Sequence, residues 1–420
     1  MTATATTTNA DEVLAGLRII DGDAHFTEPP DLWTSRAPAS MKDRVPMMRT
    51  EDGVTAWYLD GKVLCNVGGN TIQGADHVKT LGTLGVQPFE VIDPAAWSVD
   101  ARLGLLDQMG VYAQILYPNA IGFASNTMFA IKDVAQRTEI QRMYNEFLMD
   151  VQHDSGNRLF PQAVLPVWDM DLTVKEMARL RDQGVTGFTI SDKPHAVGLP
   201  DLDAPYFAPM WSLANEMGAV FNFHIGSGFG PSGDDDPVMA QIIKTGDPTI
   251  FPNPDLYWES FGPQRRLAIL ATSFYMSNAR IIVNMCMSDI FDRYPNVKIA
   301  SAESGIGWIP FILEAMEYQL DEMVTDRAEV TLQKKRPTEY FREHFVAMFW
   351  FERAAPIKLI EDIGINNVLV ETDIPHPTCI YPGARERLAE VMAQLDPHIR
   401  RRVLQDNAIE FYQLPIPASA

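Results

Sequence analysis

The amino-acid sequence predicts a (β/α)8 (TIM) barrel, and three observations lead to that prediction. Short apolar segments alternate with amphipathic segments of helical spacing along most of the 420 residues. The apolar segments are rich in apolar residues throughout rather than strictly alternating, which is typical of parallel strands buried on both faces. The length exceeds that of an ordinary domain but is common for a barrel with insertions. A doubly wound open sheet is the rival interpretation, because periodicity alone does not show closure.

The strand and helix segments follow one another in a regular order. The predicted strands are Ile19–His25, Val111–Tyr117, Gln162–Val167, Val185–Ile190, Ala219–His224, Val297–Ala302, His344–Phe351 and Asn367–Glu371. The predicted helices are Arg102–Met109, Ile131–Ser155, Leu172–Gln183, Tyr206–Met217, Ala279–Tyr294, Trp308–Val324, Ala354–Ile363, Ala384–Gln394 and His398–Tyr412. Glycine follows several helices directly, as at Gly110 and Gly218, which is the usual residue after a helix C-terminus.

Two stretches interrupt this rhythm, and we expect both to be insertions within one domain. The first, residues 31–100, contains a hairpin with a favoured Asp60-Gly61 turn. The second, residues 227–278, begins with Gly and Ser residues and is expected to be a lid. The expected organisation is a flexible leader (1–16), a single barrel domain (17–414) with insertions after its first and fifth strands, and a loose tail (415–420).

The composition excludes several classes of function. The net charge of −21 argues against nucleic acid or an anionic membrane surface as a partner, because phosphate groups would be repelled. No apolar run approaches the length of a membrane span, and the small polar N-terminus does not resemble a signal peptide. The three cysteines have no paired metal spacing and fit free thiols in a reducing compartment. We therefore expect a soluble, cytoplasmic protein.

Metal-binding side chains occur at the C-terminal ends of the predicted strands. Asp23 and His25 end the first strand, His224 ends the fifth, Glu303 follows the sixth and Asp373 follows the eighth. A barrel brings the C-terminal ends of its strands together, so these five residues are the candidate metal ligands. Taken alone, Asp23 could instead be a turn cap and His25 a hydrogen-bonded loop residue. The common placement of all five residues favours the metal site.

A divalent ion held by these residues would provide hydrolytic chemistry. It would lower the pKa of a bound water molecule and polarise a carbonyl group, while Asp373 or Glu303 carries the proton. His376 is a further catalytic candidate that could hydrogen-bond the substrate, although it could also simply brace the turn at Pro375. Two imidazoles with acidic oxygens suit zinc, with iron or manganese as alternatives, and one or two ions.

Other candidate sites are weaker. A G-x-G-x-x-G string runs from Gly228 to Gly233, but Pro231 lies within it and three aspartates follow, so a dinucleotide site is not expected. No Gly-x-Ser-x-Gly elbow accompanies the serines at strand ends, which argues against a serine nucleophile.

Several motifs, in their order along the chain, resemble the amidohydrolase-related family of the aminocarboxymuconate semialdehyde decarboxylase type. The resemblance extends from about Leu17 to Leu414. The motifs that carry it are Ile20–His25, His224–Gly226, Phe291–Lys298, Glu303–Gly305, Thr372–His376 and Asn407-Ala408 with Tyr412.

This resemblance implies a metal-dependent barrel in which His25, His224 and Asp373 match metal-binding positions. It also implies a homodimer. Asp23 stands where the family often has the first histidine of a His-x-His pair. Glu303 stands where the decarboxylase branch has a histidine that is implicated in proton transfer. This second difference puts decarboxylation in doubt.

The sequence therefore leads to three functional hypotheses. The first is a metal-dependent hydrolase that cleaves an amide, ester or thioester bond of a small apolar or aromatic organic acid derivative. The alternative is a metal-dependent, non-oxidative decarboxylase of an aromatic or unsaturated acid. The third is a barrel that binds a ligand without turning it over, which the completeness of the candidate ligand set disfavours.

Overall fold

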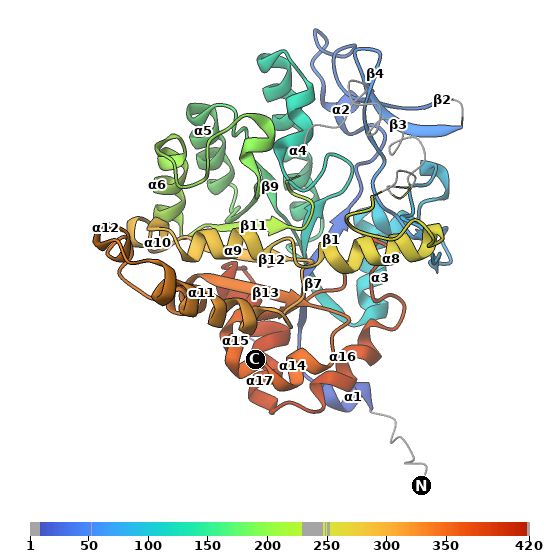
Figure 1. The fold of residues 1–420 in the computed structure, drawn as a ribbon. Helices are drawn as coiled ribbons and strands as arrows, with labels where there is room; N and C mark the ends of the chain where they lie inside the picture. The colour runs from blue at the N-terminus through green and yellow to red at the C-terminus, as the bar shows by residue number, and fades with distance from the viewer. Residues whose placement is uncertain (1–8, 52, 229–246, 248, 250–252, 418–420) are drawn as a thin grey trace.

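The computed structural model describes residues 9–417 except residues 52, 229–246, 248 and 250–252, and it contains a (β/α)8 barrel surrounded by helices (Figure 1). The prediction of this fold class is confirmed. The barrel strands are β1 (Ile19–Phe26), β7 (Val111–Pro118), β8 (Leu159–Pro161), β9 (Ala163–Val164), β10 (Gly187–Thr189), β11 (Val220–His224), β12 (Lys298–Ala302), β13 (Phe345–Phe349) and β14 (Val368–Val370).

The barrel strands run parallel, in the order in which they occur in the chain. One sheet has the order β1-β7-β8, and the other runs from β9 through β10, β11, β12 and β13 to β14. Only Gln162 separates β8 from β9, and its N–H donates to Leu116 of β7, so β8 and β9 together form one position of the barrel. Between the first and last strands, the His25 N–H donates to Ile374 O at 2.7 Å and the Asp373 N–H donates to Asp23 O at 2.9 Å.

The barrel helices cover the outside of the strands, and short helices fill the connections. The helices are α1 (Ala10–Val13), α2 (Leu32–Arg36), α3 (Val99–Met109), α4 (Val134–Asp154), α5 (Met170–Arg181), α6 (Ala208–Met217), α8 (Pro263–Phe274), α9 (Ala279–Cys286), α10 (Ile290–Arg293), α11 (Ile309–Met323), α12 (Arg327–Val330), α13 (Pro337–His344), α14 (Ala354–Lys358), α15 (Ile360–Ile363), α16 (Ala384–Met392), α17 (Pro397–Arg401) and α18 (Asn407–Phe411).

Four predicted elements differ most from the structure, and one of them is the helix expected at His398–Tyr412, which is divided into α17 and α18. The strand expected at Gln162–Val167 begins earlier, at Leu159, and ends at Val164. The helix expected at Ala279–Tyr294 is divided into α9 and α10, which are separated by residues 287–289. The helix expected at Ala354–Ile363 is likewise divided into α14 and α15.

The segment between β1 and α3 forms small sheets of its own. β2 (Met47–Glu51), β3 (Val54–Leu59) and β4 (Lys62–Asn66) make an antiparallel sheet, and β5 (Ile72–Gln73) pairs with β6 (Val78–Lys79). In Figure 1 the β2–β4 sheet projects away from the barrel. The second expected insertion, residues 227–278, lies partly outside the described residues; its described part includes α8.

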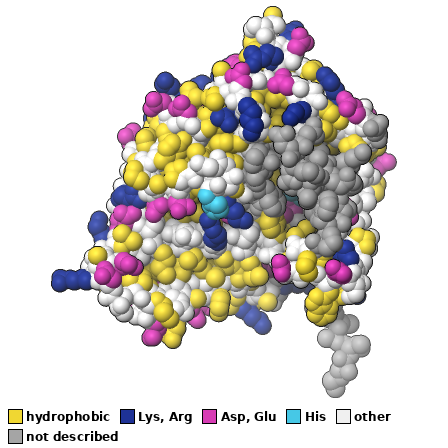
Figure 2. Space-filling view, turned by 45° about the horizontal axis from the view of Figure 1, so that its top comes forward, with side chains coloured by type: hydrophobic (Ala, Val, Ile, Leu, Met, Phe, Trp, Pro, Cys, Tyr) yellow, Lys and Arg dark blue, Asp and Glu magenta, His cyan; other side chains and the backbone are white. Residues whose placement is uncertain are grey.

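The barrel core is mainly apolar, but it also buries polar side chains such as Gln114 and Asn222. The residues of β1 and β11 are buried along their whole length, as expected for strands covered on both faces. Acidic and basic side chains are mixed with apolar ones over the face shown in Figure 2, so the negative net charge is not gathered in one patch on that face. Within the described residues, each helix is too short or too polar to span a bilayer.

Candidate metal centre

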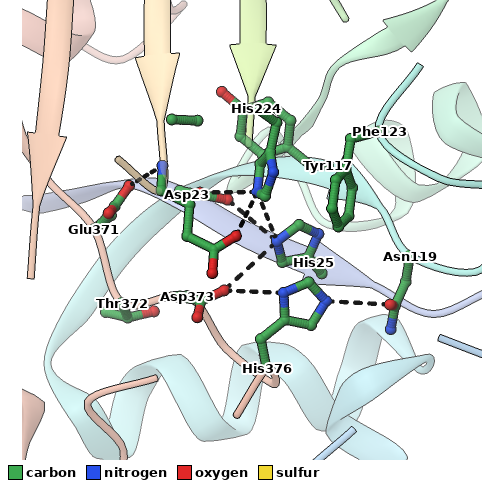
Figure 3. A network of polar contacts seen from close by, with 12 residues as sticks. Asp23, His25, Tyr117, Asn119, Phe123, His224, Glu371, Thr372, Asp373 and His376 are labelled. Carbon is green, nitrogen blue, oxygen red and sulfur yellow. Dashed lines mark hydrogen bonds and ion pairs between the residues drawn. The ribbon is translucent and has the colours of Figure 1, made fainter. Parts of the chain in front are cut away.

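The five predicted ligands converge at the C-terminal ends of the barrel strands, and Figure 3 shows four of them, Asp23, His25, His224 and Asp373. Asp23 and His25 lie on β1, His224 is the last residue of β11, Glu303 follows β12 and Asp373 follows β14. Four of these residues have no solvent exposure, and Glu303 is 8% exposed. Polar side chains are rarely buried this deeply unless they have partners, so the cluster needs a chemical explanation.

The potential donor atoms of the cluster lie close together. His25 Nε2 is 3.1 Å from His224 Nε2, 3.5 Å from Asp23 Oδ1 and 3.6 Å from Asp373 Oδ1. His224 Nε2 is 3.2 Å from Asp23 Oδ2 and 3.4 Å from Glu303 Oε2. Donor atoms that share a metal at the usual bond length of about 2.1 Å lie about 3 to 3.5 Å from one another. The spacing therefore fits ligands of one ion.

The hydrogen bonds of the two histidines determine which ring nitrogens face each other. His25 Nδ1 lies 2.9 Å from Pro118 O, and His224 Nδ1 lies 2.7 Å from Ile225 O. A carbonyl oxygen only accepts, so each Nδ1 carries the hydrogen and, in the neutral rings, each Nε2 presents a lone pair. Two lone pairs 3.1 Å apart repel each other unless a proton or a metal cation lies between them.

The carboxylates point to the same conclusion. Among the described residues, both side-chain oxygens of Asp23 and Oδ1 of Asp373 have no hydrogen-bond partner although they are buried. A buried carboxylate oxygen without a partner is costly, and a divalent cation would compensate all three of these oxygens together with both imidazoles. The residues present therefore fit a divalent metal ion. The Nδ1–H of each histidine also donates to a backbone carbonyl oxygen, and metal-binding histidines usually have this kind of support.

Burial and neighbouring charges shift the pKa values in this cluster. Burial raises the pKa of Asp23, and burial together with the negative charges of Asp373 and Asp23 raises the pKa of Glu303 well above its usual value. Burial lowers the pKa of His25 well below its usual value. Burial also opposes the charged form of His224, but the Asp23 carboxylate outweighs this effect and raises the pKa of His224.

Metal affinity should therefore depend on pH through His224. Because the pKa of His224 is raised above 6.5, a proton competes with the metal for Nε2 at and below neutral pH. We expect metal affinity to fall by about tenfold for each pH unit below that pKa and to level off above it. Competition with a chromophoric chelator at a series of pH values would measure this. An affinity that stays constant down to about pH 5 would contradict it.

Two of the candidate ligands have an unusual backbone conformation. Glu303 has φ 50° and Asp373 has φ 59°, in the left-handed region that residues with a Cβ seldom occupy. Each of these residues directly follows or lies close to a strand end, and the turn there directs its side chain into the barrel mouth. Strained backbone of this kind is concentrated at functional sites.

Asp21 lies two residues before Asp23 on β1. Its carboxylate accepts hydrogen bonds from the Thr372 N–H at 2.8 Å, the Thr372 hydroxyl at 2.5 Å and Gln114 Nε2 at 2.7 Å. Asp21 thus connects β1 with the loop that carries Asp373. It braces the site without belonging to the donor cluster.

Sequence reasoning missed three residues at the site. Glu371 is fully buried, and its Oε2 accepts the Glu303 N–H at 3.1 Å. Asn119 follows the second barrel strand and contacts His376, as Figure 3 shows. The rule of polar residues at strand ends could have found both of them. The Phe123 ring lies 4.0 Å from the His224 ring, between centroids, and no sequence pattern pointed to it.

The arrangement matches a known family. Residues 20–414 match the model of the amidohydrolase family, and the chain belongs to that family. Over 334 residues it is 24% identical to the 2-amino-3-carboxymuconate-6-semialdehyde decarboxylase of Dictyostelium discoideum. The matched region covers 78% of this chain and 79% of that protein. The family resemblance noted from the motifs is therefore confirmed.

Solved structures share the fold. An amidohydrolase from Mycobacterium avium subsp. paratuberculosis matches with a TM-score of 0.65 at 18% identity, covering 94% of this chain and 99% of that chain. A dihydroxybenzoic acid decarboxylase from Polaromonas sp., solved with bound manganese and the inhibitor 2-nitroresorcinol, matches with a TM-score of 0.59 at 18% identity, covering 96% and 98%. The family and the buried donor set indicate an enzyme with a divalent metal site.

The expectation of a hydrolase is wrong. The relative named above and the manganese-containing neighbour are both decarboxylases, and these similarities favour the alternative of a carboxy-lyase. The prediction failed because Glu303 was read only as a base or a ligand. Burial and the negative charges of Asp373 and Asp23 raise the pKa of Glu303, and the sequence alone does not show this surrounding.

Proposed function

We propose that this protein is a metal-dependent, non-oxidative decarboxylase of an aromatic or unsaturated carboxylic acid. The observation that carries the proposal is the position of Glu303, a buried carboxyl group beside a cluster of metal-binding atoms. Decarboxylation needs an acid that gives a proton to the carbon atom that loses CO2. The similarity to decarboxylases supports the same reaction class.

Asp23, His25, His224 and Asp373 are the residues we propose to hold the metal, and Glu303 is close enough to be a further ligand. A divalent ion held by these residues would supply Lewis-acid chemistry, which stabilises negative charge that develops on a substrate. We propose manganese, because the carboxylate-rich donor set suits this ion. Zinc and iron are the alternatives that metal analysis would reveal.

Glu303 is the proposed proton donor. The bond between the substrate carbon and its carboxylate breaks, CO2 leaves, and the electron pair that remains on the carbon takes the proton of the Glu303 carboxyl group. The Glu303 side chain is 11% exposed, so it can regain a proton from solvent after each turnover. The Thr378 hydroxyl lies 3.3 Å from Glu303 Oε1 and donates to Asp373 Oδ2, so it orients both carboxyl groups.

Aromatic side chains enclose the cluster on one side. Phe123 lies 4.9 Å from His25 and 4.0 Å from His224, and Tyr117 lies 5.1 Å from His224, between ring centroids. Apolar walls of this kind exclude water and favour the loss of charge that accompanies release of CO2. They also suit a flat, conjugated substrate, which supports a small aromatic or unsaturated acid.

The reaction can be tested by the fate of the proton. Protein loaded with Mn²⁺ would be incubated in D2O with a panel of hydroxylated aromatic acids and unsaturated dicarboxylic acids, and CO2 release would be measured. We expect the product to carry one deuterium at the carbon that lost CO2, and activity to disappear with a chelator and return with metal. Release of an alcohol, amine or thiol from the corresponding ester, amide or thioester, without CO2, would refute the proposal.

We also propose that the enzyme is a cytoplasmic homodimer. Its cysteines, Cys65, Cys286 and Cys379, are buried and unbridged, as in proteins of a reducing compartment. On α11, Phe311 and Tyr318 lie on one helical face and are 72% and 61% exposed. Exposed aromatic residues on one face are typical of protein interfaces, and a second copy of this chain is the proposed partner.

Replacing Phe311 with glutamate should weaken this dimer. A charge in an apolar contact costs enough to shift the equilibrium toward the monomer, because the carboxylate would lose its water there. Light scattering coupled to size-exclusion chromatography at micromolar concentration would measure the mass. Val134→Glu on α4, where the side chain is 47% exposed, serves as the control and should remain dimeric. A monomeric wild-type protein would refute the proposal.

A further inference from the structure

His376 lies against the donor cluster without an established part in it. It is 6% exposed, and its ring stacks on the His25 ring with 3.6 Å between centroids. His376 Nδ1 is 3.1 Å from Asp373 Oδ1. Suitable donor atoms of His376, Asp373, His25 and Glu303 all lie within 4.8 Å of one another, so His376 can reach the same ion.

Asn119 determines which nitrogen of His376 carries the hydrogen. The Gly69 N–H donates to Asn119 Oδ1 at 3.1 Å, and Asn119 Nδ2 donates to Gly69 O at 3.2 Å and to the Thr27 hydroxyl at 2.8 Å. These contacts fix the orientation of the amide, because the backbone N–H and C=O have unambiguous roles. His376 Nε2, 3.2 Å from Asn119 Oδ1, must therefore carry the hydrogen, and in the neutral ring Nδ1 presents a lone pair.

When the His376 ring is neutral, its contact with Asp373 is not a hydrogen bond, whereas a protonated ring would form an ion pair there. Among the described residues, Asp373 Oδ1 has no hydrogen-bond partner, although His376 Nδ1 is only 3.1 Å away. A lone pair beside a carboxylate oxygen is unfavourable unless a positive charge lies next to both atoms. The same situation holds for the two Nε2 atoms of His25 and His224. One cation would relieve both contacts.

The backbone around Asn119 is built to hold this arrangement. A Cβ on Gly68, where φ is 80°, would lie 2.2 Å from Asn119 Oδ1, and a Cβ on Gly69 would lie 3.3 Å from His376 Cδ2. Only glycine permits so close an approach at Gly68. The Thr71 hydroxyl, two residues further on, contacts the carbonyl oxygens of Pro375 and His376 at 3.0 Å each. The segment 68–71 thus holds both the amide and the loop that carries the imidazole.

We infer that His376 is a third histidine ligand of the metal, binding through Nδ1, and that Asn119 is the positioning residue that fixes its tautomer. The inference rests on the metal dependence of the proposed function but not on the reaction catalysed. The geometry that carries it is the buried Asn119–His376–Asp373 contact, in which the orientation of one amide leaves Nδ1 bare beside an unpartnered carboxylate oxygen.

Cobalt(II) is the probe for this inference, and the test needs no substrate. In the Co²⁺-loaded wild-type protein, each histidine ligand should give one strongly shifted, exchangeable ring N–H proton signal that disappears in D2O. We expect three such signals, from His25 Nδ1–H, His224 Nδ1–H and His376 Nε2–H. Two signals would overturn the inference, and this result would leave the decarboxylase proposal standing. The absence of any decarboxylase activity would conversely leave the three-signal result intact.

Variants provide a second measurement. His376→Gln should lose one signal and bind Co²⁺ at least about tenfold more weakly, and Asn119→Leu should weaken binding by about 10- to 100-fold although residue 119 does not contact the metal. His344→Gln is the matched control, because His344 is also buried and its Nδ1 contacts Val297 O, outside the cluster. It should keep three signals and the wild-type affinity. Unchanged affinity in His376→Gln or Asn119→Leu would refute the corresponding assignment.

Discussion

Asp373→Asn is expected to reduce turnover by about 10³-fold or more and to weaken metal binding by at least about tenfold. The amide keeps the size of the side chain and can still accept the Thr378 hydroxyl, so the loop should retain its shape. The variant lacks the negative charge of Oδ1, which lies 3.6 Å from His25 Nε2 and 3.1 Å from His376 Nδ1. A neutral oxygen at this point would stabilise a divalent ion much less.

The measurement is metal content by mass spectrometry, metal affinity by competition, and CO2 release with saturating Mn²⁺. Asp192→Asn is the matched control for metal binding. Asp192 is also buried and lies near a barrel strand end, but its carboxylate accepts the Ser227 hydroxyl at 3.2 Å and is outside the donor cluster. Wild-type affinity in Asp373→Asn would mean that this residue is not a ligand.

Glu303→Gln has the second large expected effect, and it acts on a different quantity. Glutamine keeps the acceptor for the Thr378 hydroxyl but has no acidic proton to give to the substrate. We expect turnover to fall by about 10² to 10⁴-fold, the usual contribution of a general acid, while metal affinity stays within about tenfold. The replacement removes a carboxyl group from an acidic, buried site, so the fold should tolerate it.

Steady-state kinetics and metal competition on the same preparation separate the two roles of Glu303. Glu371→Gln is the control. Glu371 is buried and accepts a hydrogen bond from the Glu303 N–H, but it is not a proposed proton donor. Its effect on turnover should be clearly smaller. If Glu303→Gln instead lost metal and turnover in parallel, Glu303 would be a ligand and the proton donor would have to be sought elsewhere.

The sequence predicts the barrel and the place of the site well, for a physical reason. Parallel strands buried on both faces and helices ended by glycine are local patterns, and the barrel architecture then gathers the strand ends. Asp23, His25, His224, Glu303 and Asp373 were chosen on that basis, and the structure brings them into one cluster. Element boundaries were less accurate, and the helix expected at Ala279–Tyr294 is divided in two.

The chemistry at the site was harder to predict, because it depends on contacts between distant segments. The pKa of Glu303 is raised by burial and by the charges of Asp373 and Asp23, which lie in other segments of the chain. The tautomer of His376 depends on Asn119, which in turn depends on the backbone of Gly69. Neither spacing nor periodicity carries that information. The sequence shows that Glu303 replaces a histidine of the decarboxylase branch, but it does not show which groups surround this carboxyl group.

The bonds from Asp21 to Thr372 also bear on when the site forms. They join residues 351 positions apart in the sequence, in the first and last segments of the barrel, and Asp23 and Asp373 are separated in the same way. Contacts so distant in the chain form late, because a long loop must close before they contribute. During synthesis, the contacts of β1 with the segment after β14 can form only when that segment has left the ribosome. The nascent chain therefore carries Asp21 and Asp23 without these partners until the last strand of the barrel has been made.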